Sequence, residues 1–121
     1  MAVTVTNQSN PLGSQLVQDT DAKGTAVDNA SGGSGTLYAV EVVNPNGASV
    51  YFKLADATSA TAGTTAADIV LECPASSTKN YVFLAGVAFS SGFSHWCVTA
   101  AAESNTTNPG SDVTVRYVIG V

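Results

Sequence analysis

The sequence contains very little charge. It has 4 lysine and arginine residues and 9 aspartate and glutamate residues, so charged side chains make up 11% of its 121 residues, against about 25% in an average globular protein. The net charge is −5, and the basic residues Lys23, Lys53, Lys79 and Arg116 stand singly. No basic stripe is available to neutralise phosphates, which argues against nucleic acid as a partner.

Long apolar runs are also missing. No stretch approaches the roughly 20 apolar residues of a membrane-spanning helix. The residues Met1-Ala-Val-Thr-Val-Thr lack the charged and apolar regions of a secretory signal. We therefore expect no membrane partner, and synthesis in a cytoplasm.

Residues that carry chemistry are equally scarce. The single histidine, His95, follows Gly92-Phe93-Ser94 and precedes Trp96, so the second glycine of a nucleophile elbow is absent. His95 and Cys97 share one face of an expected strand and could meet Cys73 in space, but no ligand spacing supports a metal site. The sequence predicts a non-enzymatic protein with no catalytic residue, no cofactor and no metal ligand.

Two cysteines are too few for a disulfide framework. Cys73 and Cys97 both fall in expected strands. They are interpreted either as small buried hydrophobic residues or as a cross-strand bridge, which needs their Cα atoms within about 7 Å.

The residues that are abundant predict an all-β fold. The chain has 16 valines against 6 leucines, together with 14 threonines, and β-branched residues favour pleated surfaces over helices. The 18 alanines fall mostly in Ser/Thr/Gly-rich stretches without a helical apolar stripe. Strands are expected at 36–43, 48–54, 69–73, 79–84, 93–101 and 112–119, with a short strand or bend at 86–89. Turn signals every 8–12 residues or so favour an antiparallel two-sheet β-sandwich, jelly-roll-like.

One pair of strands is expected to form a hairpin. Residues 36–43 and 48–54 alternate in polarity, and the segment Asn44-Pro45-Asn46-Gly47 between them has the composition of a tight turn. In the same region the 56–68 loop is long for a compact domain.

The first 35 residues differ from the rest. They contain no aromatic residue and cannot bury much of their own surface. We predict that 1–35 is either an extended N-terminal arm that pairs with a neighbour or a set of edge strands of the protein's own sandwich. A flexible Gly/Ser connection at 31–35 would join it to a sandwich body at 36–121.

The order of segments from residue 51 onward resembles a known family. Tyr51-Phe52-Lys53-Leu54 is followed by the Ala/Thr stretch 56–64, Ile69 to Cys73 with Pro74, the run 86–94, and a valine-rich strand ending at Ile119. This order is similar to that of small virion structural proteins of tailed bacteriophages. The resemblance implies a β-sandwich or jelly roll on the virus particle, made in the host bacterial cytoplasm.

From this resemblance we expect a capsid decoration, or cement, protein that binds where major capsid subunits meet, as a homo-oligomer and with a trimer favoured. The expected contact residues are Val3, Val5, Leu16 and Val17 in the arm, and Thr61 and Thr64 in the 56–68 loop. One alternative is a tail, baseplate or head-fibre component. Another is a carbohydrate-binding module with Tyr51, Trp96 or Tyr117 as its aromatic platform.

Overall fold

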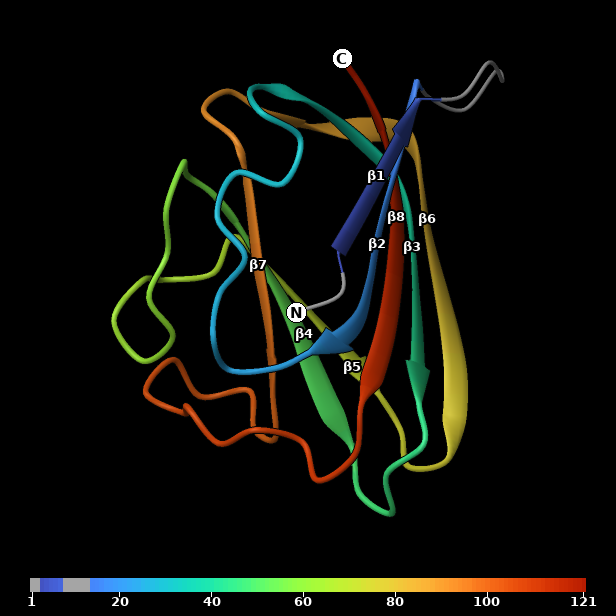
Figure 1. Cartoon of the computed structure of the whole chain (residues 1–121), viewed down its shortest axis with the longest axis vertical. Coiled ribbons are helices and arrows are strands. Elements are labelled where there is room, and N and C mark those ends of the chain that lie inside the picture. The colour runs from blue at the N-terminus through green and yellow to red at the C-terminus, as the bar shows by residue number, and fades with distance from the viewer. Residues whose placement is uncertain (1–2, 8–13) are drawn as a thin grey trace.

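A computed structural model describes residues 3–7 and 14–121, and these residues form two packed antiparallel sheets without a helix (Figure 1). The larger sheet has the order β1-β2-β8-β3-β6 and the smaller one β5-β4-β7. The strands are β1 (Val3–Asn7), β2 (Gln15–Ala22), β3 (Gly35–Asn44), β4 (Val50–Asp56), β5 (Ile69–Cys73), β6 (Ser77–Phe89), β7 (Phe93–Val98) and β8 (Val113–Gly120). The predicted all-β sandwich is confirmed.

The connections between strands give the topology of a jelly roll. A segment at 23–30 runs beside β7 and forms a rudimentary fourth strand of the smaller sheet. It pairs through a bridge between Val27 and His95, and the amide of Cys97 donates to the carbonyl of Lys23. From β2 onward every connection then crosses from one sheet to the other, except the one between β4 and β5.

The main core lies between the sheets. In β8, Val113, Val115, Tyr117 and Ile119 are fully buried and alternate with half-buried residues, so these four residues form the inward face of the strand. The facing strand β4 contributes Phe52 to the same core cluster. Period-two alternation therefore identifies the buried side of β8 correctly.

The predicted hairpin between 36–43 and 48–54 is wrong. β3 pairs with β6 and β8, whereas β4 pairs with β5 and β7 in the other sheet. The turn at 45–49 is an arch between sheets, held by the buried Asn44 side chain. Its Nδ2 donates to the carbonyls of Ala48 (2.9 Å), Cys73 (3.1 Å) and Pro74 (3.0 Å). Its Oδ1 accepts from the Asn46 amide at 3.0 Å.

The segments at 79–84 and 86–89, which were expected separately, belong to the single strand β6. A bulge separates the pairs Leu37–Val87 and Ala39–Val82. Gly86 lies in this bulge with a φ of 75°, and a Cβ atom there would approach Cγ2 of Thr36 to 2.4 Å. Glycine is therefore required on steric as well as conformational grounds.

A second apolar layer covers the outer face of the smaller sheet. Trp96, Ala55 and Val98 point away from the main core and pack against alanines of the neighbouring loops, among them Ala60 and Ala62. The alanines of the 56–68 loop thus cover a tryptophan, and small side chains allow the loop backbone to approach it closely.

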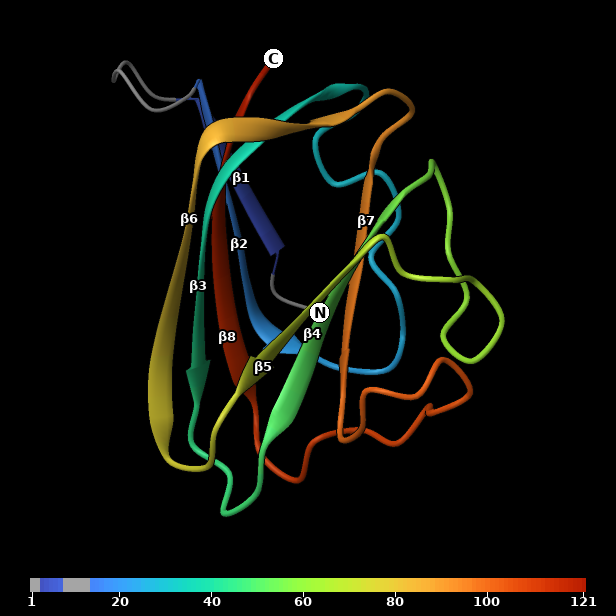
Figure 2. The same ribbon diagram turned by 180° about the vertical axis from the view of Figure 1, so that it is seen from behind.

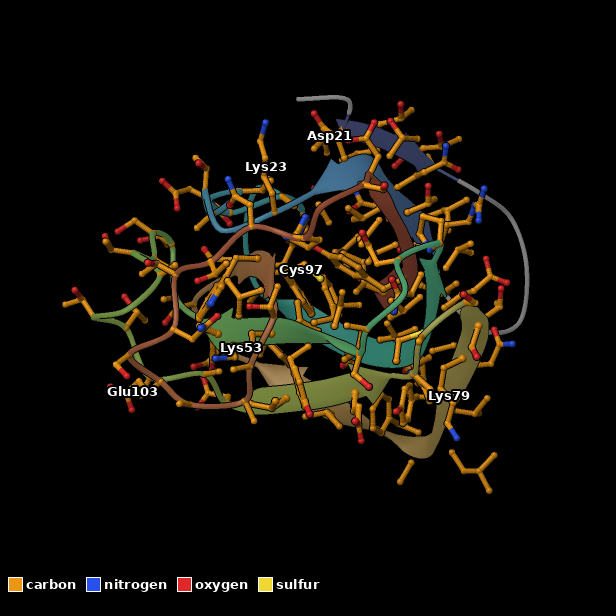
Figure 3. All side chains as sticks on the ribbon, turned by 90° about the horizontal axis from the view of Figure 1, so that it is seen from below. Asp21, Lys23, Lys53, Lys79, Cys97 and Glu103 are labelled. Carbon is orange, nitrogen blue, oxygen red and sulfur yellow. The ribbon has the colours of Figure 1, made fainter. Side chains whose placement is uncertain are left out.

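Lys53 lies beside Trp96 under the same loops and is 1% exposed. Its ammonium group donates to the carbonyl of Ala102 at 2.9 Å, and it points toward the loop that carries Glu103 (Figure 3). Burial lowers the pKa of Lys53, while the negative charge of Glu103 raises it. Through this hydrogen bond, Lys53 holds the 99–112 loop against the outer face of the smaller sheet.

Residues 3–7 and 14–35 are part of the same sandwich. β1 is the edge strand of the larger sheet and β2 is an interior strand, paired with both β1 and β8. Val17 and Ala22 of β2 lie in the main core. Within the described residues, the arrangement is that of strands added to the protein's own sheet.

Substitution Asn44→Ala tests the arch between sheets. It removes the donor for three carbonyls, one of them in a fully buried contact, and each buried group left unsatisfied costs about 1–3 kcal/mol. We expect the free energy of unfolding in urea to fall by about 3 kcal/mol. The matched change Asn80→Ala on the exposed side of β6 should cost less than about 0.5 kcal/mol. Equal losses would show that the arch does not depend on Asn44.

Candidate functional site

The outer face of the larger sheet carries a shallow apolar groove. The groove has a volume of about 240 Å³ and runs over β2, β8, β3 and β6, with apolar walls from Leu16, Ala39, Val82 and Val118. Val82 is 63% exposed, and Leu84 farther along β6 is 94% exposed. Among the residues that the structure describes, no loop covers this face in either view (Figures 1 and 2). It is therefore available to a partner.

A row of hydrogen-bonded polar side chains crosses the same face. Arg116 on β8 lies between Gln18 on β2 and Glu41 on β3 in the strand register. Its Nη1 donates to Glu41 Oε1 at 2.7 Å, and its Nε donates to Gln18 Oε1 at 3.0 Å. The guanidinium charge is matched by one carboxylate, so the face presents apolar and polar groups but no net charge.

The expected contact residues of the first segment lie in different environments. Val3 packs against the core from β1, and Val5 is 41% exposed. Leu16 lines the groove. The structure corrects the expectation that Val17 makes contacts with a partner. Val17 is 0% exposed, because its side chain points inward from β2 into the main core. Its side chain has no surface to offer a partner in this fold.

Thr61 and Thr64 are exposed at a tight turn in the 56–68 loop. The amides of Thr64 and Thr65 both donate to the carbonyl of Thr61, at 3.0 and 2.9 Å. This loop lies on the side of the smaller sheet, away from β1 and β2 (Figures 1 and 2). The structure therefore does not bring the two groups of expected contact residues together.

A buried polar triad connects the two sheets. Nε2 of His95 on β7 lies 2.8 Å from Asp19 Oδ2 on β2, and its Nδ1 lies 2.8 Å from the hydroxyl of Tyr117 on β8. Since a carboxylate only accepts hydrogen bonds, Nε2 of His95 donates to Asp19. Asp19 also accepts the Asp21 amide at 3.0 Å.

The triad is closed to solvent. His95 and Tyr117 are 0% exposed and Asp19 is 1% exposed. Burial raises the pKa of Tyr117, and the negative charge of Asp19 adds to the rise. His95 therefore joins the two sheets through hydrogen bonds inside the core.

The two cysteines are free thiols. Cys73 on β5 is paired with Val50 of β4, and Cys97 on β7 is paired with Phe52 of β4. β4 therefore lies between them, and two strand spacings of about 4.8 Å exceed the Cα separation of a disulfide. Of the two interpretations, that of small buried hydrophobic residues is correct.

The aromatic platform expected for a carbohydrate site is not exposed. Trp96 is 1% and Tyr117 is 0% exposed. Tyr51 is half-buried, and its hydroxyl donates to Glu72 Oε2 at 3.2 Å. Two of the three candidate rings are thus unavailable for stacking on a sugar.

Comparison of the chain with protein-family models, with curated proteins and with solved structures finds no match. In residues 3–7 and 14–121, no group of three or more histidine, cysteine and acidic side chains could hold a metal ion. The part of the chain that the structure describes also contains no helix with the length and apolarity needed to span a membrane.

The groove was missed by sequence reasoning. Ala39 and Val82 face each other across β3 and β6, but nothing in their local sequence indicates this pairing. The available signal was the alternation of β3 and β8, whose outward positions include Ala39, Glu41, Arg116 and Val118. Only the register of the strands shows that these residues form one surface.

Substitution Tyr117→Phe tests the triad. It leaves His95 Nδ1 without its only hydrogen-bond partner in a buried site, which costs about 1–3 kcal/mol in the free energy of unfolding. Tyr51→Phe removes a hydroxyl from an exposed hydrogen bond and should cost less than about 0.5 kcal/mol. Urea denaturation of both variants measures the difference. A Tyr117→Phe variant as stable as Tyr51→Phe would mean that the triad contributes no stability.

The native thiols should be unreactive. Burial raises the pKa of Cys97 to about 12 and also raises the pKa of Cys73. At pH 8 only about one Cys97 in ten thousand is then a thiolate, which is the reactive form. We expect Ellman's reagent to modify neither cysteine in the folded protein and both in urea. Fast modification without denaturant would contradict the burial of the thiols.

Proposed function

We propose that the chain is a non-enzymatic structural protein of a tailed-bacteriophage particle, and specifically a capsid decoration protein that binds at junctions of major capsid subunits. It is made in the cytoplasm of the host bacterium and resides on the virion. The observation that carries the proposal is the uncovered, electrically neutral outer face of the larger sheet, with its groove and the exposed Val82 and Leu84.

Two further observations support this role. The jelly-roll topology is common among viral capsid proteins, although it also occurs in lectins and cupins and a fold alone does not define a function. The order of segments at 51–119 resembles small phage virion proteins. A decoration protein acts by binding only the assembled lattice, which stabilises the lattice by mass action and requires no catalytic group.

The occupant of the groove is proposed to be a flat, weakly charged surface of the capsid lattice. Arg116 and Glu41 already satisfy each other, so neither leaves an unpaired charge that a partner must neutralise. A partner of strong charge of either sign gains nothing on this face, whereas an apolar one buries Val82 and Val118. As expected from the sequence, we propose self-association on the lattice with a trimer favoured.

Substitution Val82→Glu tests the face. Burying an unpaired carboxylate against an apolar surface is costly, so we expect binding to capsids assembled without this protein to weaken by at least about tenfold in co-sedimentation. The matched change Val70→Glu, at a 44% exposed valine of the smaller sheet, should bind like the unchanged protein. Equal binding by both variants would exclude the groove as the contact.

The number of copies on the purified virion distinguishes a capsid decoration protein from a tail component. Quantitative mass spectrometry should find on the order of hundreds of copies per particle if the protein decorates a symmetric shell. A count of a dozen or fewer would favour a tail, baseplate or head-fibre component. Absence from the virion would refute both.

A further inference from the structure

The larger sheet ends on one side in a strand that has none of the features that normally keep strand edges from pairing. β1 reads Val3-Thr4-Val5-Thr6-Asn7, without charge, proline or glycine, and it pairs residue by residue with β2 without a bulge. Native proteins usually protect such edges with charged residues, proline or bulges. Within residues 3–7 and 14–121, the outer edge of β1 therefore has main-chain groups that no strand pairs with, and it offers them to another strand.

The opposite edge of the same sheet is protected. β6 carries Lys79 near its start, and the bulge at Gly86 breaks its register with β3. A strand added to β6 would meet a positive charge and an irregular ladder, whereas one added to β1 would meet neither. The difference favours β1 as the edge that pairs.

The exposure of Val5 indicates on which face of β1 an apolar side chain still lacks a packing partner. Val5 pairs with Val17, so both side chains point to the inner side of the larger sheet. Val17 is 0% exposed, but Val5 is 41% exposed, because β1 lies at the edge of the sheet beyond the fully buried core. A second apolar side chain placed against Val5 would bury it.

We infer that the partner of β1 is β1 of a second copy of this chain, arranged antiparallel about a two-fold axis at Val5. In this register Val5 faces Val5 of the second copy, Thr4 faces Thr6, and Val3 faces Asn7, so all five residues are paired. Cross-strand valine and threonine pairs are favourable, and the two larger sheets become continuous. Such a contact is isologous, as two-fold symmetry requires.

The electrostatics of this seam also favour a second copy. Two chains of net charge −5 repel each other except where they meet through neutral surfaces. β1 and its partners Gln15, Leu16 and Gln18 on β2 are uncharged. Asp19, which faces Val3, is buried in the triad. Two copies can therefore approach through β1 without placing like charges opposite each other.

The contact is too small to form a stable dimer alone. Five paired residues per copy lie far below the roughly 20–30 residues per partner of a standard interface. The pairing is therefore weak in dilute solution and becomes effective where copies are already held near one another. It can join copies in addition to a three-fold contact. The inference that β1 pairs with β1 of a second copy rests on the edge strand and not on the capsid role proposed above.

Cysteine cross-linking of the full chain tests the contact and its register. Residues directly opposite have Cβ atoms about 4.5–5.5 Å apart, close enough for a disulfide after small adjustments. Under mild oxidation Val5→Cys should form covalent dimers at least about tenfold faster than Val82→Cys, whose site on β6 is more exposed. The native cysteines are buried and do not contribute.

Cysteine variants at Thr4 and Thr6 test whether the two β1 strands pair in the antiparallel direction. Thr4→Cys alone should cross-link no faster than Val82→Cys, whereas an equal mixture of Thr4→Cys and Thr6→Cys should cross-link about as fast as Val5→Cys. Fast self-linking of Thr4→Cys would indicate either parallel in-register pairing or a two-fold axis at Thr4, and either result would overturn the pairing centred on Val5. Equal rates for Val5→Cys and Val82→Cys would overturn the contact itself. The urea midpoint of each reduced variant confirms its fold. A cross-linking result of either kind leaves the virion copy number unaffected, so the two proposals fail separately.

Discussion

The hydrogen bonds from His95 to Asp19 and Tyr117 are the constraint on which the sandwich depends. They join β7 of the smaller sheet to β2 and β8 of the larger one in the middle of an apolar core. The rings of Phe52 and Phe93 pack around them, with centroids 5.5 Å from His95 and 6.3 Å from Tyr117, respectively. Apolar contacts tolerate small shifts of one sheet over the other, but buried polar groups do not, because a shift breaks their hydrogen bonds and leaves them unsatisfied. The triad therefore selects one docking of the two sheets.

Much of the fold could be predicted from the sequence, because the residues that favour a strand lie within that strand. Alternation of valines with polar residues indicated β8, and β-branched residues followed by a proline indicated β5. The pairing of strands, in contrast, depends on residues that are far apart in the sequence. The segment Asn44-Pro45-Asn46-Gly47 has the composition of a hairpin turn, yet the Asn44 side chain reaches Cys73 and Pro74, and these partners become visible only when the fold is known. The same holds for Lys53, whose burial depends on loops that are distant in the sequence.

The two sheets present opposite kinds of surface. The smaller sheet is covered on its outer side by loops. Alanines of these loops pack against Trp96, and the ammonium group of Lys53 donates to the carbonyl of Ala102. The larger sheet is bare over the groove and open along β1. Of the residues expected to make contacts, Leu16 lines the groove, and Val5 is partly exposed on the edge strand β1. Val17 points to the inner face and is fully buried, and the sequence alone could not say which face of its strand was inward.

The crossing connections have a consequence for how the chain reaches this state. When the 23–30 segment is counted with the smaller sheet, only β4 and β5 are joined within one sheet from β2 onward. Nearly every pairing therefore waits for segments that are far apart in the sequence. Chains dominated by such non-local contacts fold in milliseconds to seconds rather than microseconds. The triad is assembled from residues 19, 95 and 117, so it forms only after β7 and β8 have joined β2. The docking of the two sheets is therefore a late step of folding, because it needs segments from both ends of the chain in place.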